Sequence, residues 1–483
     1  MTSRSWSRWA VVGAVAGLSV VASLVLLPRP GGDSFGAGPQ ARLWWRTITL
    51  MTGEDGASAR IDGGRPGDRV WLDRSVDGSR VADGKLTVAT IPEASIAGET
   101  AVVSYAGGLL RACAEADDRA VVRCTRWTSA ADPTPDRRTR AVERLIDRYD
   151  HDTGRWSGDG GTWQSANALT ALIDYMHRTG DRQYVGYLDD VYRHGDVART
   201  GVPKQTGYHD DELWWALAWI DAYDLTHEAR YLTAARTIVD ALDDQHASFC
   251  GGGLIWARVG TDAPQHPWDQ VNSITNALYL TATAQLAVRV EPQAQAGYLS
   301  RASTAWQWFG RPPGQLLMDS SGLVEDHLDR YGDTCVVVDA GKRWTYGQGQ
   351  LISGLVALSR ATGDTGLLGD ADRIATATTR SGSEFIDNGV LTEPSATDCP
   401  GPECHDAGTF KGVFVRAYAE LLDTGRSRAA TATFLTTQAN SMPHTAIDDY
   451  PFRWQPPMIA KDQPNFATQA AALDVLNAAD AAR

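Results

Sequence analysis

Two adjacent aspartates, Asp210 and Asp211, are the residues of this chain best suited by type and spacing to do chemistry. They stand directly before an apolar run from Leu213 to Ile220. Asp is favoured at helix N-termini, so the pair is predicted to lie at the start of a helix. The helix dipole favours an anion there, and repulsion between the two groups raises the proton affinity of the second. One ionised and one protonated carboxyl group are the groups that break a glycosidic bond.

An isolated Asp-Asp pair also has a simpler interpretation, in which one carboxylate caps the helix and the other is solvated. The residues around the pair therefore decide between the catalytic and the capping interpretation. The run from Leu213 to Ile220 is apolar on all sides, which places this helix inside a larger helical body. Its first turn then emerges at one end of that body. Glu212, the next residue, is interpreted as a charge that favours the helix N-terminus.

The chain after residue 136 is predicted to consist of helical hairpins. One helix, Trp214 to Leu225, is apolar all round, whereas the next, Tyr231 to Leu242, has a single apolar face. Later segments, Leu351 to Ala361 with Leu367 to Thr379 and then Val413 to Leu422, repeat this alternation at a period of roughly 50 to 60 residues. About six such pairs fit the chain, and hairpins that close into a ring place the buried helices around the centre.

Polar and aromatic residues recur at the start of each predicted inner helix. If the inner helices run parallel, these residues meet at one end of the ring and line one cleft. Capping explains any one of them, but it explains less well why aromatic rings and amides recur at every helix. The candidates for substrate binding are Trp163, Gln164, Asn167, Trp214, Asn272, Asn276, Trp344, Tyr346, Gln348 and Lys411. Whether Trp214 stacks on a substrate or packs the core stays open.

Five ordered segments resemble glycoside hydrolase family 76, the endo-α-1,6-mannanases: residues 163–169, 210–220, 272–276, 344–349 and 410–412. The resemblance covers about residues 140 to 480. It implies an (α/α)6 barrel that cleaves α-1,6-linked mannose chains with retention, with Asp210 as nucleophile and Asp211 as general acid/base. Our reasoning from the residues supports two carboxylates but not that order. The family often has Asn where this chain has Gly347.

Three other functions stay open at this point. A transglycosylase would use the same residues with a sugar as acceptor, and a non-catalytic wall-glycan binding protein would share the fold. A prenyl or terpene enzyme would bind magnesium through the aspartates, but Trp214 and Trp215 stand where a further carboxylate is needed. We expect a monomer that acts without a metal or cofactor.

The charge of the chain excludes one class of partner. The net charge over 483 residues is -14, and no basic stripe appears, so nucleic acid is not an expected partner. An acidic protein also gains nothing from a polyanionic substrate, which favours a neutral glycan such as an α-1,6-mannan-type polysaccharide or lipoglycan. The 17 tryptophans suit stacking on sugar faces, although most such residues fill cores.

The N-terminus has the features of a targeting segment. Arg4 and Arg8 precede an uncharged, mostly apolar run from Trp9 to Leu27, which as a helix spans roughly 28 Å. No clear small-residue cleavage site follows. We therefore expect residues 1–40 to form an uncleaved membrane anchor and a linker, with a cleaved secretory signal as the alternative. The rest of the chain is exported in either case.

The region between the targeting segment and the helices has a different pattern. In residues 41–130, short runs of alternating apolar and polar residues are broken by Gly, Asp and Pro clusters, which predicts a small β-rich module. Residues 131–483 are predicted to form the helical domain. The module is expected to bind a glycan, pack on the helical domain or act as a spacer. The six cysteines suit export and suggest the pairs Cys113–Cys124, Cys250–Cys335 and Cys399–Cys404, one of fifteen possible pairings.

Overall fold

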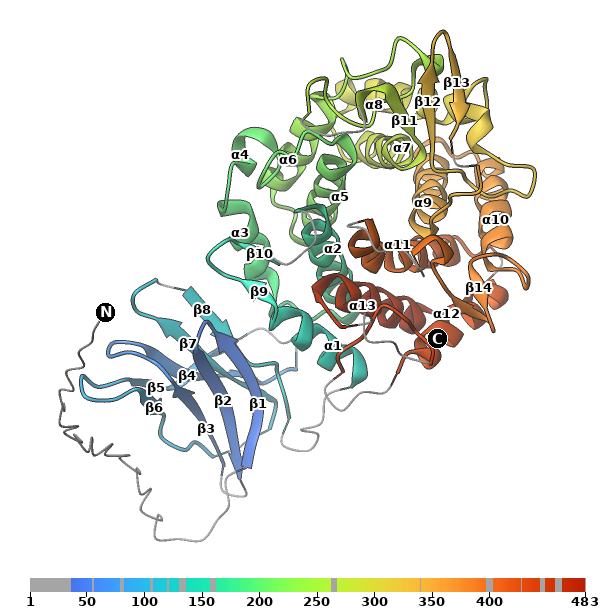
Figure 1. The fold of residues 1–483 in the computed structure, drawn as a ribbon. Coiled ribbons are helices and arrows are strands. Elements are labelled where there is room, and N and C mark those ends of the chain that lie inside the picture. Colours follow the sequence, from blue (N-terminus) through green and yellow to red (C-terminus); the bar gives the residue numbers. More distant parts are fainter. Residues whose placement is uncertain are drawn as a thin grey trace, which may run out of the picture.

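The protein consists of an N-terminal β module and a ring of helices (Figure 1). The structure is a computed structural model, and it describes residues 36–53, 56–78, 82–104, 107–119, 121–129, 136–156, 162–261, 267–338, 340–396, 403–426, 428–443, 448–456 and 463–482. The predicted membrane-spanning run at residues 9–27 lies outside these residues. Among the helices that are described, none has the length and apolar character needed to cross a membrane.

The β module is a sandwich of two antiparallel sheets. One sheet has the order β1 (Gly36–Leu43), β2 (Arg46–Gly53), β3 (Gly56–Asp62), β6 (Ala97–Glu99). The other has the order β5 (Gly84–Thr90), β4 (Arg69–Ser75), β7 (Leu109–Ala116), β8 (Val121–Cys124). Alternate apolar residues of both sheets form one core, as the period of two along a strand requires. The first strand begins at Gly36, inside the segment predicted as a linker.

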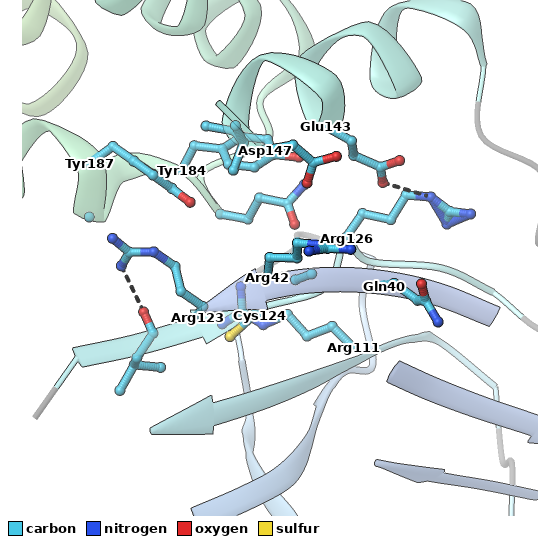
Figure 2. A pocket seen from close by; sticks show the side chains of 15 residues that line it. Gln40, Arg42, Arg111, Arg123, Cys124, Arg126, Glu143, Asp147, Tyr184 and Tyr187 are labelled. Carbon is cyan, nitrogen blue, oxygen red and sulfur yellow. Dashed lines mark hydrogen bonds and ion pairs between the residues drawn. The ribbon is translucent and has the colours of Figure 1, made fainter. Parts of the chain in front are cut away.

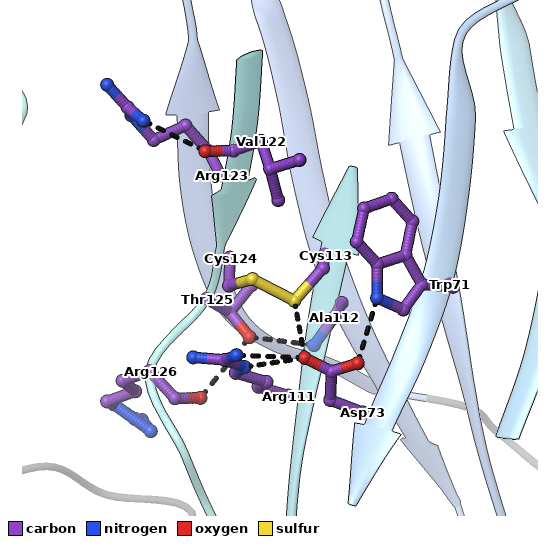
Figure 3. The surroundings of a disulfide bond; sticks show 10 residues. All are labelled: Trp71, Asp73, Arg111, Ala112, Cys113, Val122, Arg123, Cys124, Thr125 and Arg126. Atoms are coloured by element: carbon purple, nitrogen blue, oxygen red, sulfur yellow. Dashed lines mark hydrogen bonds and ion pairs between the residues drawn. A yellow bond between two sulfur atoms is a disulfide. The ribbon is translucent and has the colours of Figure 1, made fainter. Parts of the chain in front are cut away.

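A disulfide and a polar cluster stabilise one face of the second sheet (Figure 3). Cys113 and Cys124 are paired positions of β7 and β8, and the predicted bond between them is confirmed. Beside it, the buried carboxylate of Asp73 accepts hydrogen bonds from Trp71 Nε1 at 2.8 Å and from Arg111 Nη2 at 2.9 Å. The charge of Asp73 is thus satisfied by groups of its own sheet.

Within the described residues, six inner helices form a closed ring, which confirms the predicted helical toroid. They are α2 (Thr162–Thr179), α5 (His209–Thr226), α7 (Ser273–Ala287), α9 (Thr345–Thr362), α11 (Glu403–Asp423) and α13 (Phe466–Ala481). Each packs against the next in this order, and α13 packs against α2 (Figure 1). The outer helices are α1 (Arg137–Ile146), α3 (Val185–Arg193), α4 (Val197–Thr200), α6 (Ala229–Asp240), α8 (Pro292–Phe309), α10 (Gly366–Thr379) and α12 (Arg428–Ser441).

Two inner helices begin earlier in the chain than the sequence predicted. Helix α9 begins at Thr345 rather than at Leu351, and α11 begins at Glu403 rather than at Val413. Helix α5 has Asp210 and Asp211 in its first turn, as predicted. The predicted starts followed the apolar pattern, which begins one or more turns later. In the ring, the first turns carry polar and aromatic side chains because they line one end of the centre, so the apolar pattern does not mark where these helices begin.

Short hairpins and turns join the helices, where the sequence predicted only helical structure. The strands are β9 (Tyr149–Asp150), β10 (Arg155–Trp156), β11 (Gln270–Asn272), β12 (His327–Tyr331), β13 (Thr334–Val337), β14 (Ile386–Asp387) and β15 (Val390–Leu391). Cys250, in a 3₁₀ turn after α6, is bonded to Cys335 in β13, which confirms the second predicted pair. The third pair, Cys399 with Cys404, involves side chains outside the described part of the chain.

The β module contacts the ring through α1 and α3, and a cavity of about 190 Å³ lies in the junction (Figure 2). Arginines of the module line one wall, and acidic residues and tyrosines of the two helices line the other. Arg126 pairs with Glu143 at 3.1 Å, and Arg123 pairs with Asp190 at 3.3 Å. Two of the arginine charges at the junction are therefore matched by carboxylates of the helical domain.

Two glycines set the distance between neighbouring inner helices. A Cβ atom added to Gly349 on α9 would lie 2.6 Å from the Cα of Phe414 on α11. One added to Gly412 on α11 would lie 2.6 Å from the Cα of Ala471 on α13. Backbone atoms cannot move away as a flexible side chain can, so larger residues at these positions would force the helices apart.

We predict that Gly349→Ala lowers the free energy of unfolding by about 1–3 kcal/mol, the usual result of overpacking. Gly347→Ala is the matched control on the same helix, because its added Cβ meets only the Ser273 Oγ at 3.6 Å. The control should raise that free energy by about 0.5–1 kcal/mol, since Ala is the better helix former. Urea unfolding followed by circular dichroism measures both. Equal effects of the two substitutions would contradict the close approach.

Candidate active site

Asp210 and Asp211 lie in the first turn of α5, side by side at one end of the ring. Tyr208 is the N-cap of this helix and its side chain makes no capping bond, so neither aspartate is the cap. The start of α5 is fixed by a neighbouring segment. The backbone N–H of His209 donates to the carbonyl of Trp256 at 2.9 Å, and its Nδ1 is 2.8 Å from the carbonyl oxygen of Ile255.

The carboxylate of Asp210 is held by two donors. Trp256 Nε1 donates to Oδ2 at 2.9 Å, and the backbone N–H of Asp211 donates to Oδ1 at 2.9 Å. Burial raises the pKa of Asp210, and both of these hydrogen bonds act in the opposite direction by stabilising its anion. Asp210 does satisfy one N–H of the first turn, as the capping interpretation requires, but its other oxygen is bound to a residue from a distant loop.

Asp211 retains its proton more strongly than Asp210 does. Burial raises the pKa of Asp211 well above its usual value, and the neighbouring charge of Asp210 raises it further. A hydrogen bond from the Thr206 side chain lowers the pKa of Asp211 in part, but the pair loses its first proton at Asp210, where two donors favour the anion. Burial raises the pKa of Asp210 to about 7, so above that pH the pair holds one ionised and one protonated carboxyl group until Asp211 also loses its proton. This is the arrangement that two-carboxylate glycoside cleavage uses.

Glu212, expected to act only as a helix charge, has a specific partner. Its side chain is buried, and its Oε2 is 2.6 Å from Arg258 Nη2. Burial raises the pKa of Glu212 and the Arg258 charge lowers it. Arg258 stands two residues after Trp256, so this ion pair helps to hold the segment that carries the Asp210 donor.

Aromatic rings from four inner helices pack together beside the aspartate pair. Trp163 stacks on Trp214 with ring centroids 5.8 Å apart and on Phe410 at 6.1 Å. Phe410 in turn stacks on Tyr346 at 3.9 Å and meets the edge of Trp344 at 5.3 Å. These contacts bring together the four predicted tryptophan and tyrosine candidates. Trp214 is only 4% exposed, so it supports the other rings from within the core.

Three predicted amides hold loops in place. Asn276 accepts from the N–H of Leu254 at 2.8 Å and donates to its carbonyl at 3.1 Å. Gln348 forms the same pair of bonds with Val324, both at 2.8 Å. Asn272 caps α7 by accepting from the N–H of Thr275 at 3.1 Å. The amides of Asn276 and Gln348 are thus occupied by loop backbone and hold those loops in place, whereas Asn272 uses its oxygen to cap α7.

The remaining candidates lie deeper in the ring. Lys411 is 2% exposed, and its Nζ donates to the carbonyl of Phe452 at 2.6 Å. Asn167 accepts from Arg416 Nη2 at 2.6 Å and donates to the carbonyl of Trp163 at 3.3 Å. Gln164 is also buried. Asn167 thus positions Trp163, while the Lys411 cation is used inside the protein.

Trp256 and Asp406 were not predicted as site residues, and Phe410 was recognised only as part of the 410–412 motif. Asp406 Oδ1 accepts from Trp163 Nε1 at 3.3 Å. An earlier start of α11 would have revealed Asp406, because it stands four residues before Phe410 and therefore shares a helix face with it. Trp256 comes from a loop between hairpins, and no local pattern in the sequence predicts its contact with Asp210.

A closed ring of helical hairpins with paired carboxyl groups at one end is the architecture of a class of glycoside hydrolases. The sequence model of glycosyl hydrolase family 76 matches residues 135–483, and the chain belongs to this family. The mannan endo-1,6-alpha-mannosidase DCW1 of Candida glabrata is 25% identical over 324 residues. That match covers 61% of this chain and 65% of the relative, so the chain spans somewhat less than two thirds of the length of this curated protein.

Solved structures share the fold. The GH76A alpha-1,6-mannanase of Salegentibacter sp. HEL1_6 superposes with a TM-score of 0.61 at 22% identity, covering 72% of this chain and 99% of that one. Another structure of that mannanase is an inactive variant with two consecutive aspartates replaced by asparagine, in complex with alpha-1,6-mannotriose. A family 76 glycoside hydrolase from a bovine Bacteroides thetaiotaomicron strain has a TM-score of 0.55 at 15% identity and covers 92% of this chain and 99% of its own.

We predict that Trp256→Phe moves the acidic limb of the kcat/KM profile to higher pH. The substitution removes a donor that favours the Asp210 anion, so the pKa of Asp210 rises and the ionised form needs a higher pH. Loss of a hydrogen bond to a charged group also lowers kcat/KM by about 10- to 100-fold. Trp306→Phe, on the outer helix α8, is the control and should leave the profile unchanged. An unshifted acidic limb in Trp256→Phe would show that this bond does not set the ionisation.

Proposed function

We propose that this protein is an endo-acting, retaining α-1,6-mannanase that uses Asp210 and Asp211. The observation that carries the proposal is the different environment of the two carboxyl groups. Asp210 has two donors that favour its anion, whereas Asp211 lies beside that anion and retains its proton. Family membership and the similarity to an endo-1,6-alpha-mannosidase support α-1,6-mannan as the substrate class.

The reaction proceeds in two displacements. An oxygen of Asp210 attacks the anomeric carbon while Asp211 gives its proton to the departing glycosidic oxygen, so that a glycosyl–Asp210 ester forms and the bond to the leaving chain breaks. Asp211, now ionised, takes a proton from water, which attacks the same carbon and releases Asp210 as a carboxylate. Two inversions give net retention, and Asp211 ends protonated as it began.

The effect of the Asp210 charge on the pKa of Asp211 supports this division of roles. The proximity of Asp210 keeps Asp211 protonated until the Asp210 charge is consumed in the ester. Once that charge has gone, the pKa of Asp211 falls, which suits its second role as a base. A sugar hydroxyl in place of water would give transfer, so the lengths of the products distinguish hydrolysis from transglycosylation.

We predict that Asp210→Asn and Asp211→Asn are both nearly inactive on α-1,6-mannan, with losses of at least about 10² to 10⁴. An activated aryl mannoside separates them, because its leaving group needs no proton. Asp211→Asn should then release a burst and stall, and added azide should restore turnover with retained configuration. Asp210→Asn should show no burst, and azide should give only an inverted product.

Circular dichroism and thermal unfolding of both variants provide the control for folding. If the two variants exchange these behaviours, the roles of Asp210 and Asp211 are reversed. If both variants keep near wild-type activity on mannan, the pair has only a structural role and another group performs the cleavage.

We also propose that the enzyme acts outside the cytoplasm while attached to the membrane by its N-terminal segment. The support is the apolar run from Trp9 to Leu27 together with the two disulfides, which suit an oxidising compartment. A membrane attachment would hold the enzyme near glycans of the same cell surface.

We predict that cell fractionation finds the full-length chain in the membrane, with the helical domain cleaved by protease added outside the cell. The apolar run is long enough to span the hydrocarbon core and lacks a clear cleavage site. Edman sequencing of the purified protein checks its N-terminus. A mature chain that starts between Gly31 and Ala41 would show that the segment is a cleaved signal.

A further inference from the structure

A third carboxyl group, that of Asp406, belongs to the same space as the aspartate pair. Asp406 lies in the first turn of α11, which is opposite α5 in the closed order of the inner helices. Its side chain is partly exposed, and its Oδ1 accepts from Trp163 Nε1 at 3.3 Å. Burial is the main cause of the raised pKa values of Asp210 and Asp211, and the Asp406 charge adds to both.

Stacked aromatic rings connect the two sides of this space. Trp163 stacks on Trp214 from α5 and on Phe410 from α11, and Phe410 in turn stacks on Tyr346. Burial is the main cause of the raised pKa of the partly exposed Tyr346, and the charges of Asp326, Asp210 and Asp406 add to it. Trp163, Trp214 and Phe410 are buried, so Tyr346 provides the exposed aromatic surface of this stack. An aromatic ring suits the apolar face of a pyranose, whose hydroxyl groups then point outward at the ring edge.

We propose that Asp406 is a substrate-binding residue that accepts hydrogen bonds from ring hydroxyls of the mannosyl unit attacked by Asp210. This inference rests on the proposed function. The two oxygens of a carboxylate offer about four acceptor positions, so the Trp163 bond and sugar hydroxyls are accommodated together. Hydrogen bonds to an ionised acceptor are short and strong, and they would fix which face of the sugar meets the nucleophile.

The position of Asp406 also has an electrostatic consequence. An anion across the space from Asp211 disfavours a second negative charge there, so it helps Asp211 to remain protonated. Removal of the Asp406 charge lowers the pKa of Asp211, and the basic limb of the kcat/KM profile then moves to lower pH. A residue that only packed the ring would leave that limb in place.

The test uses Asp406→Asn with Asp423→Asn as the matched control, because Asp423 ends the same helix at its other end. The substrates are an aryl α-1,6-mannobioside and its analogues with single deoxy positions in the reacting ring. Asp406→Asn should lower kcat/KM on the parent substrate by about 10- to 100-fold. On the analogue that already lacks the bound hydroxyl, the kcat/KM of Asp406→Asn should be close to that of the wild type. The basic limb of its kcat/KM profile against pH should lie at lower pH.

A second variant keeps the inference testable if Asp406→Asn folds poorly. Trp163→Phe retains an aromatic ring and removes the Nε1 donor that orients Asp406. Its kcat/KM should therefore depend on the deoxy position in the same way as that of Asp406→Asn, with a smaller loss on the parent substrate. An equal loss on every analogue in both variants, or no loss in Asp406→Asn, overturns the inference. Activity equal to wild type is expected for Asp423→Asn.

Failure of the proposed function is separable from failure of this inference. A wild-type protein that does not shorten α-1,6-mannan contradicts the proposed function. Asp406 is then tested by calorimetry with α-1,6-mannotriose and the Asp210→Asn protein. Affinity lower by 10-fold or more when Asp406→Asn is added supports the role of Asp406 in binding, and unchanged affinity contradicts it.

Discussion

The hydrogen bond from Trp256 Nε1 to Asp210 is the contact on which the proposed chemistry depends, and much of the surrounding structure holds it in place. The segment that carries Trp256 is fixed at several points in succession. Cys250 is bonded to Cys335, Leu254 is paired with Asn276, and the carbonyl of Trp256 accepts from the first residue of α5. A donor with this support is organised before any substrate arrives, so no binding energy is needed to orient it.

The ring makes this arrangement possible, but it also raises the free energy of the folded state. Closing six helices around one centre places their first turns together, which buries carboxyl groups that would otherwise be hydrated. Part of the cost is offset by amides that pair with loop backbone, as Asn276 and Gln348 do. Close helix contacts at Gly349 and Gly412 hold neighbouring inner helices of the ring near one another. The raised proton affinity of Asp211 is a direct result of this burial.

The sequence predicted the architecture well because its signals are local and periodic. The all-round apolar helix after Asp211 and the one-faced helix that follows it identify the inner and outer members of a hairpin. The two disulfides within the described residues also followed from simple pairing. Polar candidates were harder to assign, because a buried Asn276 that binds a loop and an Asn that binds a sugar look alike in sequence. Trp256 and Asp406 reach the pair from other parts of the chain, so only the folded structure brings them to it.

The most direct test of the central claim is covalent trapping. The protein is incubated with a fluorinated mannosyl fluoride, which forms the glycosyl ester readily but releases it slowly, and the labelled peptide is then sequenced by mass spectrometry. The account predicts one mannosyl group per chain, attached to Asp210 and absent from the Asp210→Asn protein. A label on Asp211 or Asp406, or active enzyme that forms no adduct and gives an inverted product, would contradict it.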